Sequence, residues 1–265
     1  MRIRRVLILS ICLILPMSYA LGEPTNEIEL LSDSINIQEN AIQALNRLSS
    51  GEKPDSDRAA ALLQKTIENQ EKLSALQFEL AHLKASREKK NTDPILTDYK
   101  KTLNETVISC TSYLNRFPRS TETQAILLVR AKTYQTQEKN DLAETDFATL
   151  AFSKPKTDTT SIASLALVYL RYDLGKYDSV IETVNQLNIK PEDPHFVEMQ
   201  VKRASALEKK HQYTEALKAI QGTLGVAVDR ALKSKNTDHS NLRDAVKPQP
   251  KSMQLPSQIT SPVSP

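Results

Sequence analysis

The chain has 265 residues, and its 35 lysines and arginines against 32 aspartates and glutamates give a formal net charge of +3. The excess comes entirely from three arginines within residues 1–20, which contain no acid, so residues 21–265 carry no net charge. A neutral chain has no overall field to attract nucleic acid or an anionic membrane, so we expect neither as a partner. Five glycines and no tryptophan disfavour glycine-rich phosphate loops and all-β folds with many turns. The composition favours a helical chain that binds proteins over an enzyme.

Residues 1–20 have the layout of a secretory signal peptide. A basic start is followed by the apolar run VLILSICLILPM and by small residues before a cut expected after Ala20. The alternative is a membrane anchor, but this run has only twelve residues, and a bilayer span needs about 20. Ile11 precedes Cys12, where a lipoprotein signal requires a small residue. We therefore expect a periplasmic or secreted protein without stable membrane insertion.

Cleavage after Ala20 would leave Cys110 alone, because the chain has two cysteines and the other, Cys12, lies in the apolar run. No disulfide can then form within the chain, although export brings it to a compartment where disulfides form. A reactive thiol and a bridge to another chain are the alternatives. The position of Cys110 within a predicted helix favours a small buried side chain.

Residues 21–92 are predicted to form two helices, at 26–49 and at about 57–90, separated by a break that contains glycine and proline. Apolar residues follow heptad spacing in both helices, and Asn69 is a polar interruption that can set register or oligomeric state. Three arrangements remain open: a hairpin of the two helices, pairing with another chain as a homo-oligomer, or packing on the downstream domain. The seam predicted for the second helix consists of Leu62, Asn69, Leu73, Leu76, Leu80 and Leu83.

Residues 93–225 are predicted to form short helices in a repeated pattern, with about three units and a partial one. Small and aromatic residues recur at matching offsets in the first and last units, where the two helices of a unit cross closely. The anchors of the second helices, Ala143, Val180 and Ala216, lie 37 and 36 residues apart. The pattern predicts stacked helical hairpins, with connections slightly longer than in repeats of about 34 residues.

The stretch YLNRFPRSTETQAILLVRAKTYQTQ resembles the Y-P-x-S…A-x-x-x-L-A-x-x-Y phrase of tetratricopeptide (TPR) proteins of the bacterial cell envelope. Residues 104–225 as a whole resemble a TPR solenoid. The order of signal peptide, coiled coil and TPR units resembles the Tol-associated periplasmic cell-division coordinator family. That family has a flexible linker, barely present here, and no obvious counterpart of the proline-rich end. A TPR lipoprotein of the outer-membrane β-barrel assembly machinery is a second relative, against which the missing lipoprotein signal argues.

A TPR solenoid has a concave groove lined by the first helix of each repeat, and such grooves bind extended or helical peptides. We expect the groove to hold a partner protein, or else the N-terminal helix or C-terminal tail of the chain itself. The sequence contains no catalytic, nucleotide-binding or metal-ligand motif, so no catalytic residue, cofactor or metal site is predicted. The predicted groove residues are Leu128, Lys132, Gln135, Tyr169, Tyr172, Val201, Ser205 and Glu208.

Residues 226–265 are predicted to hold the end of the last helix and a disordered tail, because five of the final twenty residues are prolines. The whole pattern predicts an all-α, non-enzymatic scaffold in a periplasmic envelope complex, linked to cell division or to outer-membrane upkeep. One alternative is an assembly chaperone or pilotin-like factor of a secretion or pilus system. Another is an enzyme that uses carboxylates in the groove.

Overall fold

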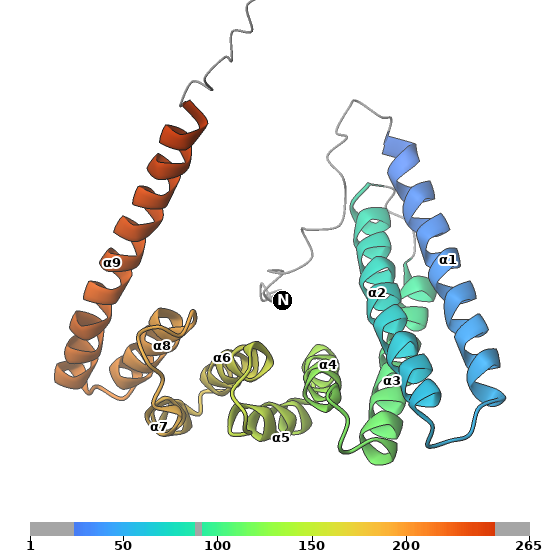
Figure 1. Ribbon diagram of the computed structural model, residues 1–265, viewed down its shortest axis with the longest axis horizontal. Helices are drawn as coiled ribbons and strands as arrows, with labels where there is room; N and C mark the ends of the chain where they lie inside the picture. Colours follow the sequence, from blue (N-terminus) through green and yellow to red (C-terminus); the bar gives the residue numbers. More distant parts are fainter. Residues whose placement is uncertain (1–23, 88–91, 247–265) are drawn as a thin grey trace, which may run out of the picture. The chain divides into compact units, whose positions relative to one another are not determined.

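The computed structural model describes residues 24–87 and 92–246. Within these ranges all of the regular structure is α-helical, as the sequence predicts (Figure 1). None of these helices is long and apolar enough to cross a bilayer. The predicted signal peptide at 1–20 and the proline-rich end at 247–265 lie outside the described residues. The helices are α1 (Pro24–Ser50), α2 (Asp57–Arg87), α3 (Asp93–Arg116), α4 (Thr123–Thr136), α5 (Asn140–Ala151), α6 (Asp158–Asp173), α7 (Tyr177–Leu187), α8 (Phe196–Lys209) and α9 (Tyr213–Val246).

The chain divides into two compact units, Met1–Leu170 and Arg171–Pro265, and the division falls inside α6. The first unit contains α1 to α5 and most of α6. The second contains the end of α6 together with α7, α8 and α9. Each unit buries apolar side chains of its own, such as Phe147 in the first and Met199 in the second.

The two N-terminal helices α1 and α2 pack against each other as a hairpin, and α3 also packs on α2 (Figure 1). The hairpin is one of the arrangements that the sequence predicts for residues 21–92. Of the predicted seam, Leu73 and Leu80 are buried, and the other four members are half-buried. Asn69 donates its Nδ2 to the backbone carbonyl of Lys65, at 2.7 Å within the same helix.

The face that α2 buries is wider than one heptad seam, because two helices cover it. Ile67 lies on the part next to α3, where it joins a buried cluster with Cys110, Tyr113 and Ile126. Cys110 is fully buried, as the sequence predicts. Burial raises the pKa of its thiol to about 12, so the thiolate, which is the reactive form, is scarce at neutral pH.

Three turns of one type connect α4 to α5, α6 to α7 and α8 to α9. Each contains a residue in the left-handed conformation, namely Glu138 (φ 59°), Gly175 (φ 73°) and His211 (φ 60°). In each turn the next residue donates its backbone N–H to the carbonyl five positions earlier, at 2.9 Å, which is the longer hydrogen bond of a Schellman helix end. The turns lie 37 and 36 residues apart. This spacing equals that of the predicted second-helix anchors, so the repeated helical hairpins are confirmed.

Candidate partner-binding surface

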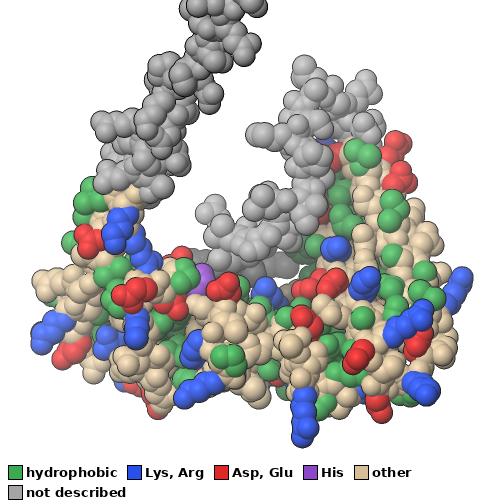
Figure 2. Space-filling model, in the orientation of Figure 1, with side chains coloured by type: hydrophobic (Ala, Val, Ile, Leu, Met, Phe, Trp, Pro, Cys, Tyr) green, Lys and Arg blue, Asp and Glu red, His purple; other side chains and the backbone are tan. Residues whose placement is uncertain are grey.

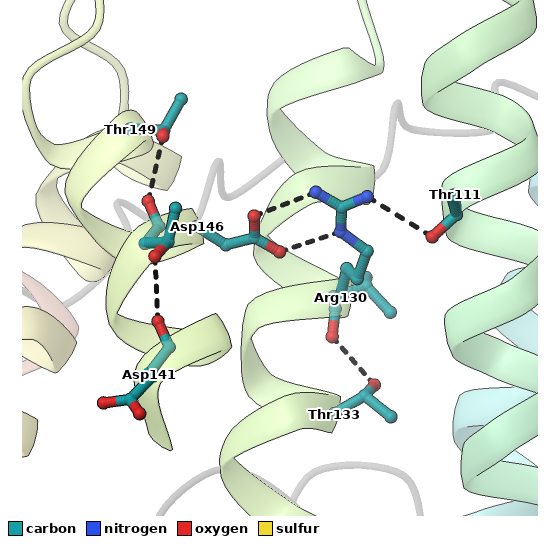
Figure 3. Close-up of polar contacts among 8 residues, drawn as sticks. Thr111, Arg130, Thr133, Asp141, Asp146 and Thr149 are labelled. Atoms are coloured by element: carbon teal, nitrogen blue, oxygen red, sulfur yellow. Dashed lines mark hydrogen bonds and ion pairs between the residues drawn. The ribbon is translucent and has the colours of Figure 1, made fainter. Parts of the chain in front are cut away.

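An ion pair with two hydrogen bonds joins the two helices of the first repeat. Arg130 of α4 donates from Nε and Nη2 to the carboxylate of Asp146 on α5, at 2.8 and 2.9 Å (Figure 3). Its Nη1 donates to Oγ1 of Thr111 on α3, at 3.3 Å. The hydrogen bonds to Asp146 raise the pKa of Arg130. These hydrogen bonds link α3, α4 and α5. Because the side chains of Arg130 and Asp146 are largely buried, little of either is accessible to a partner.

The predicted groove residues of α4 lie on one face, since they are four and three residues apart. Lys132 is exposed and Gln135 is half-buried, whereas Leu128 is only 8% exposed, so a partner would reach little of it. The neighbouring helix α2 packs beside α4, and Lys132 interacts electrostatically with Glu71 of α2. The first unit therefore places Lys132 near the carboxylate of Glu71. The heptad pattern of α2 does not identify Glu71 as a candidate.

Glu71 is a partly buried carboxyl group whose pKa is raised above its ordinary value, mainly by burial. The nearby charge of Lys132 lowers this pKa, and that of Glu68 raises it. The charged form of Glu71 is therefore less favourable than in water, and a cationic group brought by a partner would stabilise it. Among the described residues, no cluster of side chains suited to holding a metal ion is found.

A second cluster, within the second unit, joins the end of α6 to α7 and α8. The Nζ of Lys202 on α8 lies 4.5 Å from the ring centroid of Tyr172, close enough for a favourable cation–π interaction. The ring of Tyr177 on α7 meets the Tyr172 ring edge-on, with centroids 5.5 Å apart. Tyr172 belongs to the predicted groove set. Lys202 does not, because it lies one position off the predicted stripe.

The predicted residues of α8 extend this cluster along the helix. Val201 is 41% exposed, Ser205 is half-buried and Glu208 is exposed. Their spacing of four and three residues places them on one face. Tyr169 is half-buried in the first unit, so the eight predicted residues divide between the two units. We call the surface in the second unit the α8 face, made of Tyr172, Val201, Lys202, Ser205 and Glu208.

No protein-family model matches the chain, and no curated protein matches it. Solved structures with a similar arrangement include MamA, at 16% identity and a TM-score of 0.41, covering 66% of this chain and 90% of that one. A kinesin light chain from Podosopora anserina with nearly identical TPR-like repeats has 14% identity and a TM-score of 0.40, covering 80% and 99%. A tetratricopeptide repeat protein from Parabacteroides merdae has 20% identity and a TM-score of 0.32, covering 77% and 80%. Such low identities and scores give no basis for transferring a function.

Proposed function

We propose that this chain is a non-enzymatic scaffold that binds segments of other proteins on the first helices of its repeats. The observation that carries the proposal is the α8 face, where an aromatic ring, a partly exposed valine and charges of both signs lie on adjoining helices. Tyrosine supplies a large contact area at a low cost in side-chain entropy, and it is enriched where binding energy is concentrated. A segment with an apolar side chain between charged ones fits such a surface.

The contact between Lys202 and Tyr172 supports this role. The Nζ of Lys202 and the ring of Tyr177 both contact the ring of Tyr172, so the ring is positioned before a partner arrives. Preorganisation of this kind reduces the entropy lost on binding. An incoming carboxylate would meet Lys202, and an incoming lysine or arginine would meet Glu208.

The scaffold is proposed to act in the periplasm, within an envelope complex linked to cell division or outer-membrane upkeep. The signal-peptide layout of residues 1–20 and the order of the segments support this location. N-terminal sequencing of protein recovered from a periplasmic fraction tests it. A start at Leu21 is expected, whereas a start at Met1 in the cytoplasmic fraction would overturn the proposed location.

Site-specific photocrosslinking tests the binding function. A photoreactive residue at Val201 or Ser205 should yield a defined crosslinked partner, and the same residue at exposed Glu182 on α7 should not. Tyr172→Ala combined with Lys202→Ala should reduce the yield from Ser205 at least fivefold while the helical circular dichroism is unchanged. Equal yields from all three positions would sink the proposal. A partner that is released once export is complete would instead favour the assembly-chaperone alternative.

A further inference from the structure

The outer side of α1 carries a second row of apolar side chains, which the proposed function does not use. Within the described residues α1 packs on α2, and Ile42 is buried on that side. About a third of a turn away around the helix, Leu30 is 59% exposed, Ile37 64% and Leu48 53%. Hydrophobic side chains are visible at the surface in the region of α1 in Figure 2. We call this row the α1 outer stripe, made of Leu30, Ser34, Ile37, Ala41, Ala44 and Leu48.

The spacing of the α1 outer stripe is that of a coiled-coil seam. From residue 30 to residue 48, successive members alternate between steps of four and steps of three residues. This alternation keeps a row of side chains turned toward one neighbouring helix. The row is separate from the one that packs on α2, so the hairpin of α1 and α2 leaves it uncovered. The stripe therefore fits a second helix as its occupant.

Two copies of the α1 outer stripe match each other when they run antiparallel. With the pair centred at residue 39, Leu30 of each copy meets Leu48 of the other. Ile37 then meets Ala41, and the remaining two members, at positions 34 and 44, also meet. Every position of the stripe is thus opposite another position of the same stripe. This self-complementarity is what a symmetric dimer requires, because the same surface serves both copies.

Polar residues beside the stripe select a second copy as the occupant. Asp33, Asn40 and Arg47 are exposed and seven residues apart, and each directly precedes a member of the stripe, so they line the edge that faces away from α2. In the antiparallel pair, Asp33 of each copy lies beside Arg47 of the other, and the two Asn40 amides, which donate and accept hydrogen bonds, lie together. Neither Asp33 nor Arg47 has an ion pair within the described part of its own chain.

The same residues disfavour a parallel pair. Asp33 and Arg47 are fourteen residues apart, which is about 21 Å along the helix axis. In a parallel pair in register, the two residues of opposite charge would stay separated by this length. The attraction between them is available only when the two helices run in opposite directions.

We infer that the α1 outer stripe is a self-association surface, on which α1 of a second copy of this chain packs antiparallel. The inference does not depend on partner binding at the α8 face. It is compatible with the hairpin of α1 and α2, because the second copy occupies a side of α1 that the hairpin does not use.

Sedimentation velocity of the purified full chain at tens of micromolar tests the surface. A dimer is expected. Ile37→Glu should raise its dissociation constant at least tenfold and leave the helical circular dichroism unchanged, because most of the Ile37 side chain is exposed in its own copy. Leu217→Glu is the matched control, since Leu217 on α9 is 63% exposed, and it should have no effect.

Three outcomes overturn the inference. The first is a parent chain that is monomeric. The second is a dimer that Ile37→Glu leaves intact, whether or not Leu217→Glu disrupts it. The third is a dimer that forms only after residues 247–265 are removed, because the tail of the same chain would then be the occupant of the stripe.

Charge reversal tests the direction of the pair. Asp33→Arg should weaken the dimer several-fold, because it sets two cations against each other at both edges, and adding Arg47→Asp in the same chain should restore it. A dimer that neither variant changes would contradict the antiparallel packing, since the two residues would then not meet.

Disulfide trapping tests the direction independently. In a Cys12→Ser background, mixing Ser34→Cys chains with Ala44→Cys chains should give mixed disulfide dimers on mild oxidation, while each chain alone gives few. Disulfides that link Ser34→Cys chains to one another as readily would show a parallel pair and contradict the proposed packing.

Discussion

Arg130 in the first repeat and Arg203 in the third occupy the same place, 73 residues apart, yet their surroundings differ. Arg130 is paired through two hydrogen bonds with Asp146. In the third repeat, Ala219 stands at the position that Asp146 holds in the first. The buried Nε of Arg203 therefore has no hydrogen-bond partner within the described residues. An apolar position shows the same contrast. Phe147 is fully buried, whereas Ile220, its counterpart on α9, is 41% exposed.

The second repeat adds a third arrangement. There Thr183 stands where Asp146 stands in the first repeat, and its hydroxyl accepts a hydrogen bond from Arg171. The helix-to-helix turn is the same in all three repeats, so the backbone architecture does not depend on these polar contacts. The polar contacts set how strongly the two helices of each hairpin are held together. The apolar residues on the outer face of a hairpin set whether another helix can pack on it.

Breaking the ion pair of the first repeat should have the largest effect. Asp146→Ala leaves the guanidinium of Arg130 largely buried and unpaired, so we expect the free energy of unfolding to fall by about 3 kcal/mol. Urea denaturation followed by circular dichroism measures this change. Arg203→Met is the matched control and should cost less than about 1 kcal/mol, because no carboxylate loses its partner. Similar losses in both variants would contradict the comparison.

Changing the residue in the left-handed turn should have the next largest effect. Gly175→Ala should lower the free energy of unfolding by about 1–2 kcal/mol, because the left-handed conformation costs an L-residue about this much conformational energy. A Cβ at Gly175 would meet no atom within 4 Å, so the cost is in the backbone alone. Glu138→Gly should give the opposite sign, a gain of about 0.5 kcal/mol. Thermal denaturation measures both, and an unchanged melting temperature in both variants would show that the turns are not strained.

Giving the third repeat the carboxylate of the first should sharpen the comparison. Ala219→Asp is expected to raise the free energy of unfolding by about 1 kcal/mol, because it supplies the buried Nε of Arg203 with an acceptor. The same substitution in an Arg203→Met background should give no gain. A gain that persists in that background would mean that the new carboxylate acts elsewhere, and urea denaturation of the four chains separates these outcomes.

The smallest expected effect concerns pH and Glu71. Its raised pKa means that the folded chain binds the proton more readily than the unfolded chain does. The contribution of Glu71 to the stability of the wild-type chain therefore falls as pH rises past the ordinary pKa of a glutamate. Glu71→Gln should be more stable than wild type at pH 7, by up to about 1 kcal/mol, and equally stable near pH 3. Urea midpoints across this range measure the difference, and a constant gap at all pH values would rule out the titration of Glu71 as its cause.

The repeat spacing could be predicted from the sequence because helices that cross closely require small side chains at fixed intervals. The left-handed conformation of Glu138 and His211 could not be predicted in this way, since residues other than glycine rarely adopt it. Ile67 was missed because heptad spacing identifies a single seam, while a helix covered by two others buries a broader face. Lys202 was missed for a related reason. Its contact with Tyr172 arises from the crossing of helices in different repeats, which spacing along one helix does not contain.

The burial of Cys110 also determines how the chain reacts with an oxidant. A folded copy keeps this sulfur protonated and out of contact, so it exchanges slowly with disulfides or glutathione. An unfolded copy exposes the same atom with ordinary reactivity, and two such copies can become covalently joined. Covalent crosslinking through this sulfur is thus a fate of chains that have not folded, and rapid folding would protect against it.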